Sequence, residues 1–528
     1  MREPSAVFVQ SDLSDGLTAA VRSGPTWSAA GAEVTWNDGA VDVTATTISR
    51  VALRWTERLP ASALILGDAW ERSYGDLQWR HVQPERLLPW YFLVHDPQTG
   101  TTTGAGVDVQ PNAFCAWTVD GDGFTLWLDL RNGGGPAHLR GRTLAAATVR
   151  LFETGYIEDG GTPWQTLNAA VATMSTRLPA RPEPAPVVGA NNWYYAYGEN
   201  FDEKAVLQDA TTIVELADGH PVKPFSVVDD GWYPGGVCSG GPWDRGTPGV
   251  FDDMAGTAAA IKAIGARPGL WFRPLLVREP GPWASTAPHD KPGRALDPSY
   301  PEVLDGVRAD LQRFKSWGFE LVKHDFGTYD VFGAFGPAMG SRLTRGGWQL
   351  HDTSRTTAEI ILAFYREIRA AAEGVVLIGC NTVGHLAAGL VDVQRTGDDT
   401  SGRDWERTRK MGVNTLAFRL PQHNRFFAVD ADCVPCTPQT PWELNARFLD
   451  LVARSGTALF LSIDPAARTE RSDQALRDGI HLALSGGAAS GVEPTDWLTN
   501  STPNAWRAGE ESLHYDWSRP WGADPTAN

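Results

Sequence analysis

Residues 321–327 read LVKHDFG, an apolar stretch that contains Lys323, His324 and Asp325 in a row. Side chains alternate between the two faces of a strand, so Lys323 and Asp325 would share one face and His324 would point to the other. A barrel strand that sends a lysine and an aspartate inward near its carboxyl end is typical of a catalytic strand. An interior ion pair is the alternative that this stretch alone leaves open.

Seven further apolar stretches, three before this strand in the sequence and four after it, complete a regular alternation of strands and helices. They are NNWYYAYG (191–198), PFSVVDDGW (224–232), RPGLWFRPLLV (267–277), VVLIGC (375–380), VDVQRTGDD (391–399), RFFAVDADC (425–433) and ALFLSID (458–464). Amphipathic stretches at 201–217, 300–318 and 353–374 lie between them. Eight such units predict a (β/α)8 TIM barrel over residues 188–465, with its site at the carboxyl ends of the strands.

The sequence on either side of the barrel has a different character. Residues 1–180 alternate short strands with Gly and Asp turns, which predicts an N-terminal β-sandwich. The Pro-rich stretch RLPARPEPAPVVG (177–189) is typical of a stiff connector. The tail, 466–528, is expected to form a small C-terminal β domain. The whole chain is therefore predicted to be an α/β protein of three domains.

Composition limits the class of partner. The 528 residues carry a net charge of -17, which argues against nucleic acid and against an anionic membrane. The 22 Trp residues suit flat apolar ligands such as sugar rings. No stretch has the length and apolarity of a signal peptide or a membrane helix, and five cysteines agree with a reducing compartment, so we expect a cytoplasmic protein. The sequence does not indicate an oligomeric state.

Polar side chains gather where the predicted strands end. They are Asp229, Asp230, Trp271, Arg273, Lys323, Asp325, Cys380, Asn381, Arg395, Asp398 and Asp399. No HxH, HExxH or GxSxG pattern accompanies them, so we expect no metal, no cofactor and no serine nucleophile. What remains is a pocket of carboxylates, basic groups and Trp walls.

This set suits the cleavage of a glycosidic bond, which requires two carboxylates on either side of the bond. Asp325 and Asp399 lie on the fourth and sixth predicted strands, so their side chains can approach each other across the barrel mouth. Retention of configuration would require about 5–5.5 Å between the two carboxyl groups. Asp398 competes with Asp399 for the acid role.

Nine short motifs, in order along the chain, resemble glycoside hydrolase family 36, the α-galactosidases of clan D, and especially its compact bacterial members. They are GDAWERSYG, NNWYYAYG, VVDDGW, PGLWFRP, ALDPSYPEV, LVKHDFG, LIGC, VDVQRTGDDT and NRFFAVDADC. The resemblance covers most of the chain. It implies the same three domains and a retaining exo-glycosidase that hydrolyses terminal α-galactosides through a covalent glycosyl-enzyme intermediate.

The resemblance also implies a role for each matching residue. Asp325 would be the nucleophile, and Asp399, four residues after Arg395, would be the acid/base. Asp229 and Asp230 would hold sugar hydroxyls, as would Lys323 and Arg395. Pocket-wall positions would be Trp193, Trp271 and Cys380, with Trp70 lent by the N-terminal domain.

Two departures from the family pattern bear on the substrate. Arg273 stands where relatives have a small or acidic residue, so it is expected either to contact the substrate or to balance charge, and Asn381 follows Cys380 where compact relatives have Gly. Trp70 and Cys380 could each be a core packing residue instead of a pocket contact. The sequence does not indicate a role for His385. The open alternatives are a transglycosylase, a clan D glycosidase acting on an α-N-acetylgalactosaminide, β-L-arabinopyranoside or α-glucoside, and a metal-dependent barrel hydrolase.

Overall fold

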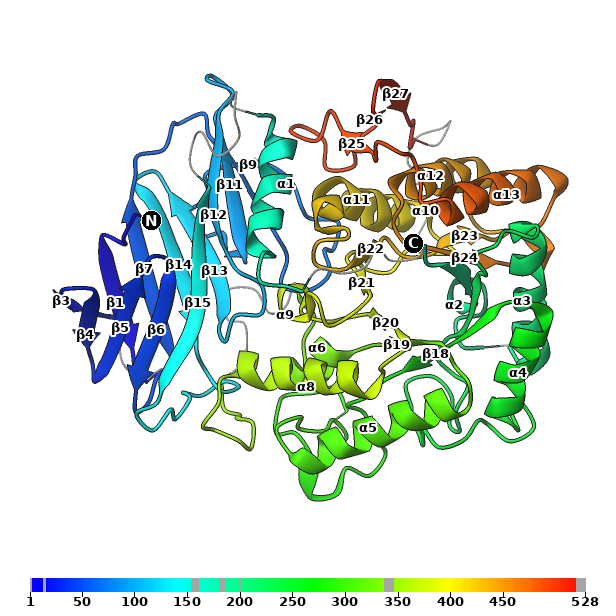
Figure 1. Cartoon of the computed structure of the whole chain (residues 1–528), viewed down its shortest axis with the longest axis horizontal. Coiled ribbons are helices and arrows are strands. Elements are labelled where there is room, and N and C mark those ends of the chain that lie inside the picture. The colour runs from blue at the N-terminus through cyan, green and yellow to red at the C-terminus, as the bar shows by residue number, and fades with distance from the viewer. Residues whose placement is uncertain are drawn as a thin grey trace.

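The computed structural model describes residues 2–12, 16–152, 161–179, 186–199, 201–291, 293–336 and 346–518. A body of antiparallel strands lies at one end of the molecule and a ring of parallel strands wrapped by helices at the other (Figure 1). Much of the predicted connector, residues 180–185, lies outside the described residues.

The N-terminal body consists of two antiparallel sheets that face each other. The first, in spatial order, holds β10 (Leu88–Pro89), β13 (Phe114–Asp120), β14 (Gly123–Asp129), β7 (Arg50–Thr56), β1 (Ala6–Gln10) and β2 (Thr18–Ala19). The second holds β3 (Val21–Ser23), β4 (Thr26–Ala29), β5 (Ala32–Asn37), β6 (Ala40–Ala45), β15 (Thr143–Phe152), β12 (Thr102–Val107), β11 (Tyr91–His95), β8 (Leu64–Gly67) and β9 (Arg80–His81).

Alternating burial shows why these segments form facing sheets. In β5 every second residue is buried, and Trp36 of that strand meets Trp55 of β7 at 5.7 Å between ring centroids. Phe92 and Trp117 make a second contact between the sheets, at 5.3 Å. The helix α1 (Pro163–Met174), which begins at a capping box on Thr162, was not expected in this all-strand region.

The parallel sheet of the second body has nine segments. Their order is β22 (Ala428–Asp430), β21 (Val393–Arg395), β20 (Val376–Gly379), β19 (Leu321–His324), β18 (Arg267–Phe272), β17 (Phe225–Val228), β16 (Val188–Asn191), β24 (Leu459–Ile463) and β23 (Val434–Cys436). The seventh predicted stretch, 425–433, contains β22, and β23 begins directly after it; between the two, Asp432 has a left-handed backbone with φ 73°. The amide of Ala458 donates to the carbonyl of Val429 at 2.9 Å and joins the two ends of the sheet, which fits the predicted barrel.

The first barrel strand was placed too late in the sequence. It runs over Val188–Asn191, and most of the aromatic stretch NNWYYAYG forms the short helix α2 (Trp193–Ala196) with the turn that follows it. The other seven predicted strands are confirmed within their stretches. Consequently Trp193 and Tyr194 lie just beyond a strand end rather than within a strand.

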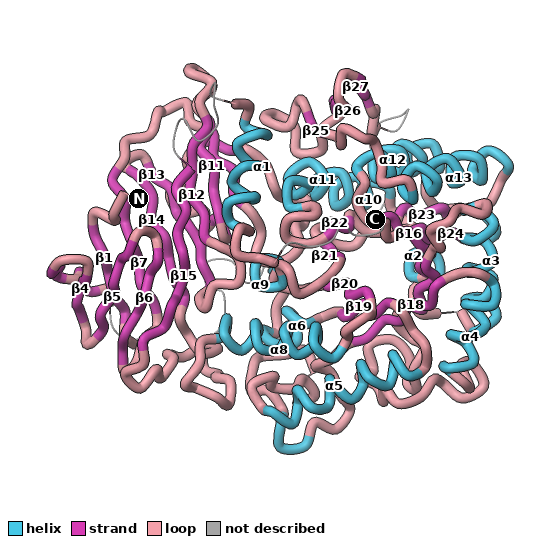
Figure 2. Tube along the Cα trace, viewed as in Figure 1, coloured by secondary structure: helices cyan, strands magenta, loops and turns pink. Residues whose placement is uncertain are grey.

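Helices cover the outside of the parallel sheet (Figure 2). They are α3 (Glu203–Ala217), α4 (Met254–Ile264), α5 (Pro301–Ser316), α6 (Gly327–Phe332), α8 (Thr357–Ala371), α9 (Gly384–Ala387), α10 (Trp405–Thr408), α11 (Asn414–Arg419), α12 (Trp442–Ser455) and α13 (Glu470–Leu484). The three amphipathic stretches predicted from the sequence are confirmed as α3, α5 and α8. In α8 a capping box of Thr356 and Glu359 starts the helix, and its apolar face is buried.

The stretch 466–528, predicted as a small C-terminal β domain, contains a helix as well as strands. Helix α13 packs against α12 and α3 and so continues the outer ring of the barrel. A three-stranded antiparallel sheet then follows, with β25 (Glu493–Pro494), β26 (Ala505–Ala508) and β27 (Glu511–His514). Within the described residues, none of the helices combines the length and the apolarity that crossing a membrane requires.

Candidate active site

A cavity of about 250 Å³ opens at the carboxyl ends of the parallel strands. Its described lining consists of Arg72, Tyr74, Trp193, Tyr194, Asp229, Asp230, Cys238, Trp271, Lys323, Asp325, Phe326, Phe335, Asp398, Asp399 and Arg407. Seven of the residues expected at a substrate pocket are therefore brought together here: Trp193, Asp229, Asp230, Trp271, Lys323, Asp325 and Asp399.

One wall of the cavity holds the Asp229–Lys323 pair. The Lys323 ammonium donates to Asp229 Oδ2 at 2.7 Å, and both side chains are buried. The Asn191 amide donates to the same oxygen at 2.6 Å. A buried lysine beside a carboxylate offers both a donor and an acceptor, which is the pairing that a sugar hydroxyl group needs.

Asp230, the neighbour of Asp229, is held from the other side. Its two oxygens accept from the Tyr233 hydroxyl at 2.6 Å and from the Cys238 amide at 3.1 Å. Burial raises the pKa of Asp230 to about 6, with a further upward contribution from Asp229 and an opposing one from the Tyr233 hydroxyl. This carboxyl group therefore changes its charge close to neutral pH.

Asp325 is the carboxylate that lies among neutral donors. It follows β19 directly, and it accepts from the amide of Phe326 at 2.6 Å and from the indole Nε1 of Trp271 at 3.2 Å. Trp271 and Lys323 are paired across β18 and β19, so the indole and Asp325 open onto the same cavity. No ion pair to Asp325 is found in the described part of the chain. Two neutral hydrogen bonds orient this group while leaving it available to react.

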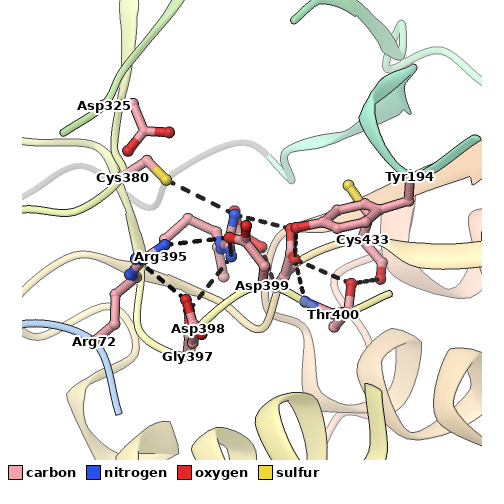
Figure 3. A network of polar contacts seen from close by, with 12 residues as sticks. Arg72, Tyr194, Asp325, Cys380, Arg395, Gly397, Asp398, Asp399, Thr400 and Cys433 are labelled. Atoms are coloured by element: carbon pink, nitrogen blue, oxygen red, sulfur yellow. Dashed lines mark hydrogen bonds and ion pairs between the residues drawn. The ribbon is translucent and has the colours of Figure 1, made fainter. Parts of the chain in front are cut away.

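Asp399, by contrast, lies among cations. Its Oδ1 accepts from Arg395 at 3.0 Å and from Arg72 at 3.2 Å, and its side chain is 40% exposed (Figure 3). Burial alone would raise the pKa of Asp399, but Arg395, Arg72 and, farther off, Lys323 outweigh it and lower the pKa to about 2. At neutral pH this carboxyl group is therefore ionised.

Asp398 shares the cations but turns away from solvent. It pairs with Arg72 at 3.2 Å and with Arg407 at 2.6 Å, and its side chain is only 12% exposed. Asp398 and Asp399 therefore differ in access: Asp398 is tied to two arginines at the edge of the cavity, while Asp399 presents more of its surface to it.

Arg395, which contacts Asp399, is itself held by a buried carboxylate. It pairs with Asp432 at 2.9 Å, and Asp432 accepts from the amide of Thr400 at 2.7 Å and from the hydroxyl of Tyr194. Figure 3 shows this network reaching from Arg72 across Arg395 to Thr400. Because Arg395 is 2% exposed, it acts on the cavity through Asp399 rather than by direct contact.

Arg273 does not reach the cavity. Its guanidinium makes two hydrogen bonds to Asp330 of α6, at 2.6 and 2.9 Å, and lies 4.0 Å over the ring of Phe326. His289 contacts the same carboxylate at 3.0 Å. Both partners of the pair are almost fully buried. Of the two roles that the sequence left open, this geometry is the charge-balancing one.

Two more expected contact residues lie one layer behind the lining. Cys380 is 1% exposed, and its sulfur accepts from Arg395 at 3.8 Å. Asn381, with a left-handed backbone at φ 55°, donates to Glu71 at 2.5 Å and accepts from the amide of Tyr329 at 3.1 Å. Their side chains support the cavity wall, since the lining in the described residues does not include them.

Trp70, which was expected to contact the substrate, lies in a cluster of aromatic rings outside the cavity lining given above. The Trp70 indole is 4% exposed and meets Trp90 at 5.2 Å and Phe114 at 5.8 Å. Arg72 and Tyr74 of the same loop line the cavity instead. Sequence reasoning missed both, although the charged residues of GDAWERSYG gave a signal. The N-terminal body therefore contributes to the pocket as expected, but through Arg72 and Tyr74 instead of Trp70.

The described residues do not form a group of three or more His, Cys, Asp and Glu side chains arranged to hold a metal ion. His324 faces away from the cavity, as the strand alternation predicted, and is buried beside Tyr365. His385 is stacked on Trp90 at 4.9 Å and contacts the carbonyl of Val107 at 2.8 Å. Both histidines are packing residues.

Comparison with known proteins gives matches in structure only. No family model matches the chain, and no curated protein does. TtGalA, an alpha-galactosidase from Thermus thermophilus solved in complex with p-nitrophenyl alpha-D-galactopyranoside, superposes with a TM-score of 0.61 at 17% identity, over 92% of this chain and 97% of that one. The chain has the fold of the family 36 α-galactosidases.

Other structures of the same family agree with that match. The glycoside hydrolase family 36 alpha-galactosidase AgaA from Geobacillus stearothermophilus gives a TM-score of 0.57 at 14% identity, over 90% of this chain and 70% of that one. A variant of AgaA in complex with raffinose gives 0.58 at 15% identity, over 96% of this chain and 79% of that one. The shared fold spans the N-terminal body as well as the barrel.

Proposed function

We propose that this protein is a retaining exo-glycosidase that hydrolyses terminal α-galactosides. The observation that carries the proposal is one cavity in which two carboxylates have opposite surroundings. Asp325 is oriented by neutral donors, and Asp399 is held by arginines and is open to the cavity. The Asp229–Lys323 pair and Asp230 supply the polar wall that a sugar ring needs. The bound ligands of the structural relatives, a galactoside and raffinose, guide the choice of sugar.

The proposed reaction has two displacement steps. An Asp325 oxygen attacks the anomeric carbon and forms an ester, while the bond to the leaving-group oxygen breaks and that oxygen takes a proton from Asp399. Asp399, now ionised, removes a proton from water, and the water oxygen attacks the anomeric carbon. The ester bond then breaks and Asp325 leaves as a carboxylate, so the two inversions retain the configuration.

The charge of Asp399 places a condition on this reaction. With a pKa of about 2 the carboxyl group holds no proton at neutral pH, yet the first step requires one. Substrate in the cavity must therefore weaken the contacts of Asp399 with Arg72 or Arg395 and remove water from its exposed side. Both changes raise the pKa of a carboxyl group.

Release of nitrophenol from four nitrophenyl glycosides tests the proposal. We expect the α-galactoside to be cleaved faster than the α-N-acetylgalactosaminide, the β-L-arabinopyranoside and the α-glucoside, with the α-anomer of galactose formed first. Asp325→Ala is the matched control and should lose about 10³-fold or more in kcat, or at least ~4 kcal/mol of transition-state stabilisation. If the wild-type protein cleaves none of the four, or the Asp325→Ala variant keeps its rate, the proposal is wrong.

A further inference from the structure

A loop of the N-terminal body is built into the barrel next to Asp398 and Asp399. The amide of Ser73 donates to the carbonyl of Thr396 at 2.8 Å, and the amide of Asp398 donates to the carbonyl of Ser73 at 2.8 Å. Ser73 and Gly397 thus form a parallel bridge that extends β21 beyond its end. The backbone directly after Arg72 is therefore fixed relative to the two carboxylates, although they are more than 300 residues apart in the chain.

The Arg72 side chain is held as firmly as its backbone. Its two terminal nitrogens each lie 3.2 Å from a carboxylate, one from Asp398 and the other from Asp399. The rings of Tyr74 and Phe335 lie 5.7 Å from the guanidinium carbon, and the side chain is 7% exposed. A planar fork that is packed between rings and bound at two points fixes the orientation of both partners.

We propose that Arg72 is a positioning residue for the acid/base step: it orients the Asp399 carboxylate and supplies positive charge beside it. This inference rests on the proposed function, since it assigns Arg72 a task within that reaction. It also makes the N-terminal body part of the active site rather than a neighbour of it.

The other charged groups around Asp399 do not replace Arg72. Besides Arg72, the cations nearest to Asp399 in the described part of the chain are Arg395 and Lys323, and each is also engaged by a buried carboxylate, Asp432 and Asp229 respectively. Arg407 pairs with the far oxygen of Asp398. The acidic groups that face this region include Asp229, Asp230, Asp325, Asp398 and Asp432. The Tyr194 hydroxyl is neutral beside them, because burial raises its pKa. Loss of Arg72 removes one of the two arginines that contact Asp399, while the carboxylates around it stay, and this raises its pKa.

Replacement of Arg72 by methionine should separate two kinds of substrate. An opposite charge within about 4–6 Å lowers a carboxyl pKa by roughly 1–3 units, so Arg72→Met should move the basic limb of the kcat/KM profile to higher pH by at least about one unit. We expect this with a poor leaving group such as a trisaccharide. With a dinitrophenyl galactoside, whose departure needs little proton donation, the profile should stay in place. Arg72→Lys keeps the charge and should keep most of the wild-type profile.

Arg54→Gln is the matched control, because Arg54 forks onto Asp120 at 2.7 Å within the N-terminal sheets and lies outside the cavity lining. It should not change either profile. Folding of each variant can be followed by ¹³C NMR of labelled aspartate, which also reports the Asp399 pKa without turnover. If Arg72→Met cannot be folded, Arg72→Gln removes the same charge with a shorter side chain that keeps hydrogen-bonding groups.

Three results would overturn the inference: an unchanged Asp399 pKa in the charge-removing variant, an equal displacement of both pH profiles, or an Arg72→Lys variant that behaves like the methionine variant. A wild-type protein that cleaves no α-galactoside is a different failure. It would refute the proposed function, while the NMR titration would still decide whether Arg72 sets the charge of Asp399.

Discussion

Removal of charge from Asp330 tests whether Arg273 is a structural residue. In Asp330→Asn the side chain keeps its size but loses its charge, and it can accept only one of the two guanidinium hydrogen bonds now made at 2.6 and 2.9 Å. Arg273 would then be a buried cation whose close contacts are one hydrogen bond to the substituted amide and the ring of Phe326, with its carboxylate partner removed. A buried ion pair that loses one member typically costs about 3–5 kcal/mol.

The converse variant should cost less. Arg273→Met leaves Asp330 with His289, whose Nε2 already lies 3.0 Å away and can donate a hydrogen bond to the carboxylate. The two hydrogen bonds lost, worth about 1.5–3 kcal/mol each, are partly offset by the contact with His289 and by the methionine packing in the same space. These compensations have no counterpart in Asp330→Asn. We therefore expect Asp330→Asn to be the more destabilising of the two changes.

Equilibrium urea unfolding, followed by tryptophan fluorescence, measures the free energy of unfolding of each variant and so tests which change is the more destabilising. Each folded variant should keep the wild-type KM values and the wild-type order of preference among α-galactosides, because neither side chain lines the cavity. If Arg273→Met alters that order while the free energy of unfolding stays unchanged, Arg273 contacts the substrate and the structural role is refuted.

The remaining predictions concern the carboxylates of the cavity. A slow fluorosugar should label the protein once, and peptide mapping should find the label within residues 321–327; a label elsewhere would exclude Asp325 as the nucleophile. Asp399→Ala should slow a poor leaving group far more than a dinitrophenyl galactoside, and azide should restore turnover of the latter; equal losses would favour Asp398. Because Asp230 gains a proton as the pH falls through about 6, KM should rise below that pH. Tyr233→Phe, which removes the hydrogen bond that favours the ionised form, should move this rise to higher pH by about one unit, and an unmoved KM profile would show that Asp230 does not control binding.

The strand-end residues could be predicted from the sequence because strand alternation and the position of barrel sites both assign them to the cavity. Strand alternation assigns Lys323 and Asp325 to one face, and the barrel rule places that face at the carboxyl end where neighbouring strands also end. The structure brings both residues to the cavity together with Asp229 and Asp399. These positions follow from local periodicity, which a single sequence does contain.

Other features depend on contacts that local sequence does not encode. Arg273 has the expected inward position, but its partner Asp330 comes from the helix after the next strand, so its direction could not be inferred. The stretch after Asn191 is rich in aromatic residues typical of strands, yet burial of Tyr194 against the end of the sheet favours a helical turn. Arg72 reaches the cavity only because two domains pack together.

The bridge between Ser73 and Gly397 has a consequence for anyone who wishes to shorten or recombine this protein. A barrel expressed alone would retain every strand and both proposed catalytic aspartates, but the segment that carries Asp398 and Asp399 would lose the backbone partner beside it. The exposed edge left there would offer unpaired amide and carbonyl groups to other chains. The smallest unit suitable for engineering is therefore the barrel together with the N-terminal body. A recombinant protein that exchanges one of them should keep the loop that carries Ser73 together with its partner segment at Gly397.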